Sequence, residues 1–207
     1  MSAEAERPSF VHETAIVEEE VVIGPGSAIW DHVHLRRGAR IGRDCIVGEK
    51  TYVAYGVEIG DLVKLNASVY VCAGVRIGDG VLVAAHVVFT NDVAPRACDP
   101  DLRELLPSSP TGTTLSTLVE RGASIGANAT IGPGLVLGEF CMVGMGAVVT
   151  RSVPPHGLVA GNPARLVGLV CRCGSRVARF GADRRELPPG DYPCANCGRL
   201  VSWPSRP

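Results

Sequence analysis

Four cysteines near the end of the chain have the residue type and the spacing of a metal site. Cys171 and Cys173 form one pair, Cys194 and Cys197 form a second, and a glycine follows each pair. Four thiolates supplied by two tight turns match the closed tetrahedral coordination of structural zinc. The Cys-x-x-Cys of the second pair is a common zinc spacing, whereas the Cys-x-Cys of the first pair is tighter than usual. The spacing predicts a structural Zn²⁺, and the alternative is unliganded or redox-active thiols.

His86 is a candidate for proton transfer because it directly precedes a long polar segment. A histidine titrates near neutral pH, so it can remove a proton from an attacking ammonium group. The alternative is an exposed or interface histidine. Asn91 and Asp92 open the polar segment, and taken alone they form a turn signal.

The repeat that must position these residues has a period of six. Every sixth residue from position 11 to position 89 is aliphatic or Phe, and the same register returns from 119 to 149. This spacing fits neither a helix nor an unbroken strand, but it fits a short strand with a bend every six residues. The sequence therefore predicts an all-β parallel β-helix. At three hexads per coil it has about seven coils and is roughly 30 Å long at the usual strand spacing.

The 18-residue coil places His86 in one outer column with Ser68, Lys50 and His32. The repeat also divides the chain. We expect a flexible N-terminus over residues 1–10, the β-helix over 11–166, and a four-cysteine, zinc-ribbon-like tail over 167–207. Residues 90–118 are rich in Pro and polar residues and lack the hexad. A loop insertion of this length in a compact repeat is usually functional.

Composition excludes several classes of protein. The 207 residues carry 20 Lys and Arg against 21 Asp and Glu, a net charge of -1, so no overall field attracts nucleic acid or an anionic membrane. A hydrophobic content of 46% excludes a disordered chain. Neither a secretory signal nor a run of about 18 apolar residues is present, so we expect a soluble cytoplasmic protein. In that compartment, cysteines indicate thiols or metal ligands instead of disulfides.

Two motifs and the hexads together resemble the left-handed β-helix acyltransferases. The motifs are GMGAVV at residues 144–149 and GNPAR at residues 161–165. Within that family, the chain is most similar to nucleotide-linked 3-amino-sugar N-acetyltransferases. That similarity lies in VFTND at 88–92 with Pro95 and Arg96, GASIGANATI at 122–131, and the Cys-rich tail. The resemblance implies left-handed coils, acetyl-CoA as co-substrate, a nucleotide sugar as acceptor, and a homotrimer with active sites between subunits.

The resemblance also implies roles for the acceptor-side residues. Asn91 and Asp92 would lie beside the amine, with His86 as the candidate base, and Arg96 would pair with the sugar diphosphate. A solvated loop residue is the alternative for Arg96. His34 and Arg36 follow Trp30 in an early coil similar to that of the family, and we expect them to bind substrate or to lie in the trimer interface.

The residues expected to bind CoA lie in the two acyltransferase motifs. Backbone amides of Gly144 and Gly146 would approach the pantetheine arm. In the second motif, Asn162 and Pro163 would shape a break in the chain, and Arg165 would meet the CoA phosphates. A plain C-terminal turn is the alternative for the second motif.

The predicted reaction is acetyl transfer, in which a deprotonated sugar amine attacks the thioester and CoA thiolate leaves. Another small amine or a hydroxyl group is the main alternative acceptor, because loop 90–118 sets that choice. A γ-type carbonic anhydrase needs three His on one metal, whereas His32 and His86 lie roughly 14 Å apart in their column. A non-catalytic scaffold is the third hypothesis.

Overall fold

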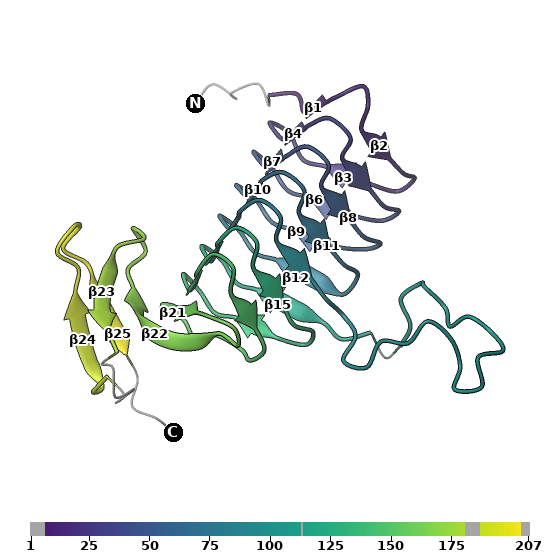
Figure 1. The fold of residues 1–207 in the computed structure, drawn as a ribbon. Helices are drawn as coiled ribbons and strands as arrows, with labels where there is room; N and C mark the ends of the chain where they lie inside the picture. The colour runs from purple at the N-terminus through teal and green to yellow at the C-terminus, as the bar shows by residue number, and fades with distance from the viewer. Residues whose placement is uncertain (1–6, 113, 181–186, 204–207) are drawn as a thin grey trace.

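The computed structural model describes residues 7–112, 114–180 and 187–203. Their hexad coils form a triangular prism of short strands, to which the inserted loop and the C-terminal tail are attached (Figure 1). No α-helix occurs in these ranges, and hence none that could span a membrane. The all-β parallel β-helix predicted from the hexads is confirmed. Each coil contributes one strand to each of three parallel sheets, which we call faces A, B and C.

The faces are built as follows. Face A contains β1 (Phe10–Val11), β4 (Ala28–Ile29), β7 (Ile46–Val47), β10 (Lys64–Leu65), β13 (Leu82–Val83), β16 (Ser124–Ile125), β19 (Met142–Val143), β21 (Gly157–Ala160), β22 (Arg165–Val170) and β23 (Arg176–Arg179). Face B contains β2 (Ile16–Val17), β5 (His34–Leu35), β8 (Tyr52–Val53), β11 (Tyr70–Val71), β14 (Val88–Phe89), β17 (Thr130–Ile131) and β20 (Val148–Val149). Face C contains β3 (Val22–Ile23), β6 (Arg40–Ile41), β9 (Glu58–Ile59), β12 (Val75–Ile77), β15 (Thr117–Val119) and β18 (Val136–Leu137).

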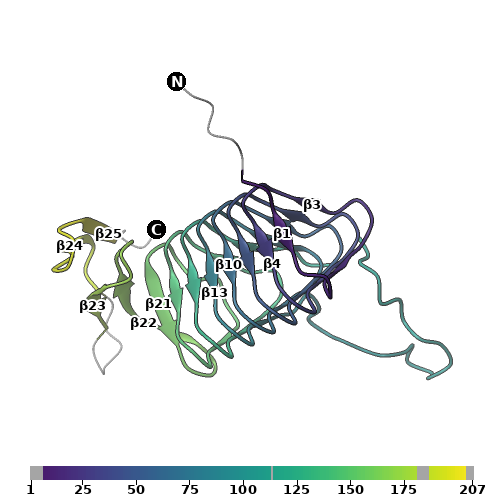
Figure 2. The ribbon, with the colours of Figure 1, turned by 90° about the horizontal axis from the view of Figure 1, so that it is seen from above.

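The strands pair in the 18-residue register that the hexads predict. Lys64 pairs with Ile46 below it and with Leu82 above it. The next pair on face A joins Leu82 to Ser124, which lies 42 positions further along, so the extra 24 residues belong to the inserted loop. This loop leaves face B after β14 and returns to face C at β15, and it projects away from the prism (Figures 1 and 2).

Inward-facing aliphatic side chains stack along the axis of the prism and form the core. Ile29, Leu65 and Leu137 in this row are fully buried. The smaller inward position two residues earlier also holds polar side chains whose hydrogen bonds are satisfied. Ser27 is one of these: its Oγ donates to the Gly42 carbonyl at 2.7 Å and accepts the Cys45 N–H at 2.9 Å.

The first coil departs from the hexad expectation. Val11 and Val17 occupy inward positions, yet they are 41% and 40% exposed because no coil lies beneath them. Residues 1–6 lie outside the described residues. Phe10 already belongs to β1, and Arg7 forms an ion pair with Asp44. The ordered coil therefore begins slightly before the expected boundary at residue 11.

The C-terminal end of the prism is covered by the tail. Face A continues from β21 into two antiparallel strands, β22 and β23, and a hairpin of β24 (Gly190–Pro193) and β25 (Leu200–Trp203) follows. Cys171, Cys194 and Val201 form a small buried cluster against which Val177 packs. Figure 1 shows the tail at one end of the solenoid and the first coil at the other.

Candidate functional site

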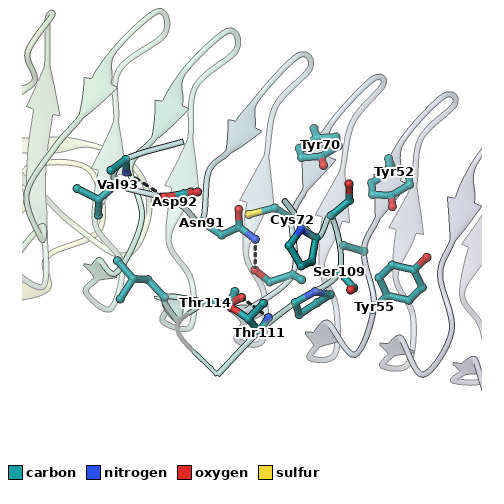
Figure 3. Close-up of a pocket in the computed structure, with 17 residues that line it drawn as sticks. Tyr52, Tyr55, Tyr70, Cys72, Asn91, Asp92, Val93, Ser109, Thr111 and Thr114 are labelled. Atoms are coloured by element: carbon teal, nitrogen blue, oxygen red, sulfur yellow. Dashed lines mark hydrogen bonds between the residues drawn. The ribbon is translucent and has the colours of Figure 1, made fainter. Parts of the chain in front are cut away.

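A cavity of about 510 Å³ lies between face B and the inserted loop, at the corner where faces B and C meet. It is lined by three successive coils and by the loop, as the close-up in Figure 3 shows. The coils contribute Tyr52, Ala54, Tyr55, Tyr70, Cys72, Ala73, Asn91, Asp92, Val93 and Ala94. The loop contributes Pro107, Ser108, Ser109, Pro110, Thr111, Thr114 and Leu115. Asn91 and Asp92, the pair expected beside the reacting amine, are thus in a cavity.

Asn91 and Asp92 present hydrogen-bond acceptors. Asn91 Nδ2 donates to the Ala73 carbonyl at 3.2 Å, which fixes the amide and leaves Oδ1 as its acceptor atom (Figure 3). Asp92 is exposed, and its Oδ1 accepts the Ala94 N–H at 2.9 Å. An acceptor amide oxygen beside a carboxylate suits a ligand group that carries N–H bonds.

Two tyrosines form a wall of the cavity that sequence reasoning missed. Tyr52 and Tyr70 are register partners on neighbouring strands, and their rings stack at 5.1 Å between centroids with an interplanar angle of 6°. Burial raises the pKa of Tyr70, so this phenol stays protonated at neutral pH. The spacing of 18 residues between two outward tyrosines was the signal that could have revealed the wall.

His34 and Arg36 border this wall without lining the cavity. The His34 ring meets Tyr52 edge-on at 5.5 Å, and Arg36 donates to the Tyr52 hydroxyl at 2.8 Å. The Arg36 guanidinium also lies 4.1 Å from the centre of the Tyr55 ring. Arg36 therefore positions two tyrosines of the cavity and does not itself reach into it.

Glu18 holds His34 and Arg36 in place. Its Oε1 lies 2.9 Å from His34 Nε2 and 2.6 Å from Arg36 Nε, the second being an ion-pair contact without hydrogen-bond alignment. Its Oε2 accepts the Arg37 N–H at 2.8 Å. Desolvation raises the pKa of Glu18, but the Arg37 N–H, His34 and Arg36 together outweigh it and lower the pKa below its usual value.

The structure separates His86 from Asn91 and Asp92. His86 is exposed at the corner between faces A and B, with a φ of 60°, and its N–H donates to the Ala67 carbonyl at 3.0 Å. His32, Lys50 and Ser68 take the same left-handed turn position in the coils below, as the 18-residue register predicts. Strand β14 lies between this corner and Asn91, so the three candidate catalytic residues do not share one wall within a chain.

Arg96 also stands apart from the cavity lining. It is exposed on the loop, and its guanidinium donates to the carbonyl of the neighbouring Pro95 at 2.9 Å. The loop turns back after it through a bridge between Cys98 and Leu105 and then reaches the cavity with Pro107.

The residues expected to bind CoA gather at the same corner as His86. Gly144 and Gly146 lie between β19 and β20, and Gly146 has a φ of 67° with no heavy atom within 4 Å of where a Cβ would stand. Directly above, the Gly161 carbonyl accepts the Val148 N–H at 3.0 Å. The backbone at Gly146 is therefore open to close approach by a ligand.

The second expected CoA motif forms a turn over the last coil. The Asn162–Pro163 peptide bond is cis, and the Ala164 N–H donates to the Val148 carbonyl at 2.8 Å. Arg165 is exposed, and it donates to the Ala164 carbonyl at 2.9 Å. The motif thus lies beside Gly146 and on the other edge of face B from the cavity.

The four tail cysteines converge. Their Sγ atoms all lie within 4.8 Å of one another, with Cys171 to Cys197 at 3.5 Å and Cys173 to Cys194 at 3.6 Å. Tetrahedral zinc with Zn–S bonds of about 2.3 Å needs sulfur separations of about 3.8 Å. The donor set therefore fits the metal predicted from the spacing. Within the described ranges, no other cluster of three or more His, Cys, Asp or Glu has this proximity.

Cys173 is prepared to act as a thiolate. Hydrogen bonds from the side chain and backbone of Ser175, and from Asn196, lower its pKa to about 5. Both knuckles turn on glycines with positive φ, Gly174 at 83° and Gly198 at 73°. By contrast, burial raises the pKa of Cys141 to about 12, as suits a core thiol without a ligand role.

Comparison with protein-family models identifies the repeat. The bacterial transferase hexapeptide model, of six repeats, matches residues 56–91. The hexapeptide repeat of succinyl-transferase matches residues 38–73 and 117–151. Hexapeptide-repeat models thus match the chain on both sides of the inserted loop.

One curated relative matches a short segment strongly. It is the dTDP-3-amino-3,6-dideoxy-alpha-D-galactopyranose 3-N-acetyltransferase of Aneurinibacillus thermoaerophilus, 54% identical over 61 residues. The matched segment is 30% of this chain and spans only about a third, 32%, of the length of that relative.

Two solved structures share the architecture. One is a variant of AntD, an N-acyltransferase from Bacillus cereus in complex with dTDP and coenzyme A, with a TM-score of 0.53 at 20% identity. The match covers 79% of this chain and 81% of the AntD chain. At that identity the likeness establishes the fold alone. A maltose O-acetyltransferase from Clostridium difficile 630 has a TM-score of 0.52 at 26% identity, and covers 65% of this chain and 70% of its own.

Proposed function

We propose that this chain is an acyl-CoA-dependent N-acetyltransferase that acts on the amino group of a nucleotide-linked amino-deoxysugar, with the 3-amino position favoured. The observation that carries the proposal is the cavity in which Asn91 and Asp92 stand beside stacked tyrosines. The segment 54% identical to a dTDP-3-amino-sugar N-acetyltransferase supports the same acceptor class.

Asn91 and Asp92 orient the acceptor amine in this mechanism. The Asn91 Oδ1 and the Asp92 carboxylate accept its N–H bonds, so the nitrogen lone pair is directed away from them and toward the thioester carbonyl. The C–N bond then forms, the C–S bond breaks, and the thiolate of CoA leaves and takes up the proton that the attacking nitrogen loses. Backbone N–H groups stabilise the developing oxyanion.

The stacked tyrosines hold the nucleotide part of the acceptor. Tyr70 is 45% exposed, so its ring offers a flat surface on which a nucleobase can stack. His34 and Arg36 support this substrate site by fixing Tyr52 and Tyr55. Arg96, exposed on the loop, supplies a guanidinium for the sugar diphosphate.

Acetyl-CoA binds at the corner between faces A and B. Open backbone at Gly146 admits the pantetheine arm, whereas Gly144 beside it packs against Ala160. Asn162 and Pro163 shape the adjacent turn. Arg165 is exposed there and supplies a guanidinium for the CoA phosphates.

Assembly as a homotrimer would join the two halves of the site. The CoA corner, with His86, and the Asn91 cavity lie on opposite edges of face B. If the corner between faces A and B of one subunit faces the corner between faces B and C of its neighbour, His86 approaches the amine as its base. Leu102 and Leu105, at 78% and 82% exposed, give the projecting loop apolar side chains that a neighbouring subunit would cover.

Structural Zn²⁺ in the tail belongs to the same proposal. Cys171, Cys173, Cys194 and Cys197 would hold it, and a tail with few buried side chains would gain its stability from that bond.

The proposal is tested by measuring the release of free CoA from acetyl-CoA with each member of a panel of acceptors. The panel contains UDP- and dTDP-linked 3-amino and 4-amino sugars, with maltose as a hydroxyl acceptor. We expect turnover with a 3-amino sugar and none with maltose. Turnover with maltose alone would favour O-acetyl transfer, the activity named for the Clostridium difficile structure. If no acceptor in the panel releases CoA and the chain does not bind CoA, the non-catalytic scaffold becomes the favoured hypothesis.

A further inference from the structure

The charge of the chain is strongly divided. The tail, residues 167–207, contains seven arginines and three acidic residues, a formal charge of +4. Residues 1–166 contain 13 basic and 18 acidic residues, a formal charge of -5. The net charge of -1 therefore hides a cationic tail, and this tail sets up a local field that attracts anions.

A second cavity, of about 390 Å³, lies where this tail meets the last coils. It is lined by His156, Cys171, Arg172, Arg199, Leu200, Val201 and Ser202. The two arginines come from the two metal knuckles: Arg172 lies between Cys171 and Cys173, and Arg199 follows Gly198. The turns that gather the four thiols therefore also bring two arginines to one cavity.

Contacts with Phe140 and the backbone hold Arg172 and His156 in place. Arg172 packs over the Phe140 ring at 4.6 Å, and Phe140 stacks on His156 at 5.6 Å with an interplanar angle of 17°. His156 Nδ1 donates to the Val170 carbonyl at 2.9 Å, which fixes the ring and leaves Nε2 as its other polar atom.

No carboxylate among the described residues pairs with Arg172 or Arg199. The nearby Arg121 is occupied by Glu139 at 2.9 Å. Asp191, beside the cavity, accepts the Ser202 hydroxyl at 2.7 Å. Two arginines thus line one cavity with no described counter-ion, an arrangement that favours an anionic ligand.

We propose that this cavity binds a phosphate or diphosphate group through Arg172 and Arg199, with His156 at its side. The planar guanidinium fork matches phosphate oxygens and forms short, charge-assisted hydrogen bonds. The site lies at the corner between faces C and A, away from the Asn91 cavity, and it does not depend on the proposed acyl transfer. The phosphate can come from a free phosphorylated metabolite or from CoA itself.

Calorimetric titration of the full chain with inorganic pyrophosphate, at fixed ionic strength, tests the site. We expect saturable binding that weakens about tenfold in Arg199→Gln and in Arg172→Gln, the loss typical of one charged hydrogen bond. Arg176→Gln, on β23 of the same tail but outside the cavity lining, is the matched control and should keep the wild-type affinity.

Two results would overturn the proposal: no saturable binding to the wild-type chain, or equal weakening in all three variants, which would indicate diffuse attraction to the tail. Bound zinc is measured in each variant, and Arg199→Lys is added to keep the charge if Arg199→Gln loses metal. Titration with CoA and with dephospho-CoA then separates the sources. If Arg199→Gln lowers the affinity for CoA but not for dephospho-CoA, the site binds the 3′-phosphate of CoA. If Arg199→Gln lowers the affinity for pyrophosphate alone, the site binds a free phosphorylated ligand.

Discussion

Among single residues, Asn91 is the one on which the proposed orientation of the acceptor amine depends. Because its Nδ2 is held by the Ala73 carbonyl, its Oδ1 is fixed in the cavity before any ligand binds. Asn91→Ala should therefore lower kcat by about a hundredfold, the usual effect of losing one orienting group, with little change in folding. Steady-state kinetics measures this. Lys64→Ala, exposed on face A and outside both corners of the site, is the control, and equal rates for the two variants would remove Asn91 from the site.

Tyr70 gives a prediction that separates binding from chemistry. Stacking on an aromatic side chain contributes about 1–3 kcal/mol per base. Tyr70→Ala should thus raise KM for the nucleotide-linked acceptor about tenfold and leave KM for acetyl-CoA unchanged, whereas Tyr70→Phe keeps the ring and should behave as wild type. A matching rise in both KM values after Tyr70→Ala would show a general loss of structure instead of a lost stacking surface.

At the scale of elements, the inward half of the β-helix was predictable and the outward half was not. Inward residues such as Leu65 repeat because each must fill the same space in every coil. Outward residues are not constrained by the packing of the core, so no repeat in the sequence predicts the stacked Tyr52 and Tyr70. The course of the inserted loop was likewise hidden, because its leucines are exposed and have no period. The tail cysteines could be predicted because their spacing is local in sequence, whereas Asn91 was singled out only through the resemblance of VFTND to a family motif.

The cluster around Glu18 links β2 and β5 and makes stability depend on pH. The pKa of Glu18 is lowered below the ordinary value of 4.5. Its contribution to the free energy of unfolding is therefore complete above pH 4.5 and is lost as the pH falls through the lowered folded-state pKa. The urea midpoint of wild type should therefore exceed that of Glu18→Gln at pH 6, and the gap should close in the acid range. A gap that is constant with pH would mean that the Glu18 charge is not responsible.

The tail is expected to depend on the zinc proposed for its four cysteines. Cys194→Ser removes one of four ligands and should reduce bound zinc to well under one ion per chain and loosen β24 and β25, because the tail buries few other side chains. Metal analysis and amide hydrogen exchange report the two effects. Cys98→Ser, in the loop, should keep full metal content. Full metal content in Cys194→Ser would contradict the zinc assignment.

At the scale of the whole molecule, the two halves of the site lie on opposite edges of face B, so activity should require neighbouring subunits. His86→Ala and Asn91→Ala should each be weak alone. Co-assembled in equal amounts in a cyclic trimer, they should recover roughly a quarter of wild-type activity, because a quarter of random neighbour pairs combine two intact halves. No recovery in assemblies shown to be mixed would place both residues in one subunit or remove His86 from catalysis.

Acetyl transfer to a sugar amine can be followed by the position of a labelled acetyl group in the product. Acetyl-CoA labelled with ¹³C at the carbonyl is incubated with the chain and a dTDP-linked 3-amino-3,6-dideoxyhexose, and the product is followed by NMR. The account predicts that the label appears as an amide on the 3-amino nitrogen at the rate of CoA release. Label that remains in acetyl-CoA while CoA binding persists, or that appears as an ester on a sugar hydroxyl, would contradict it.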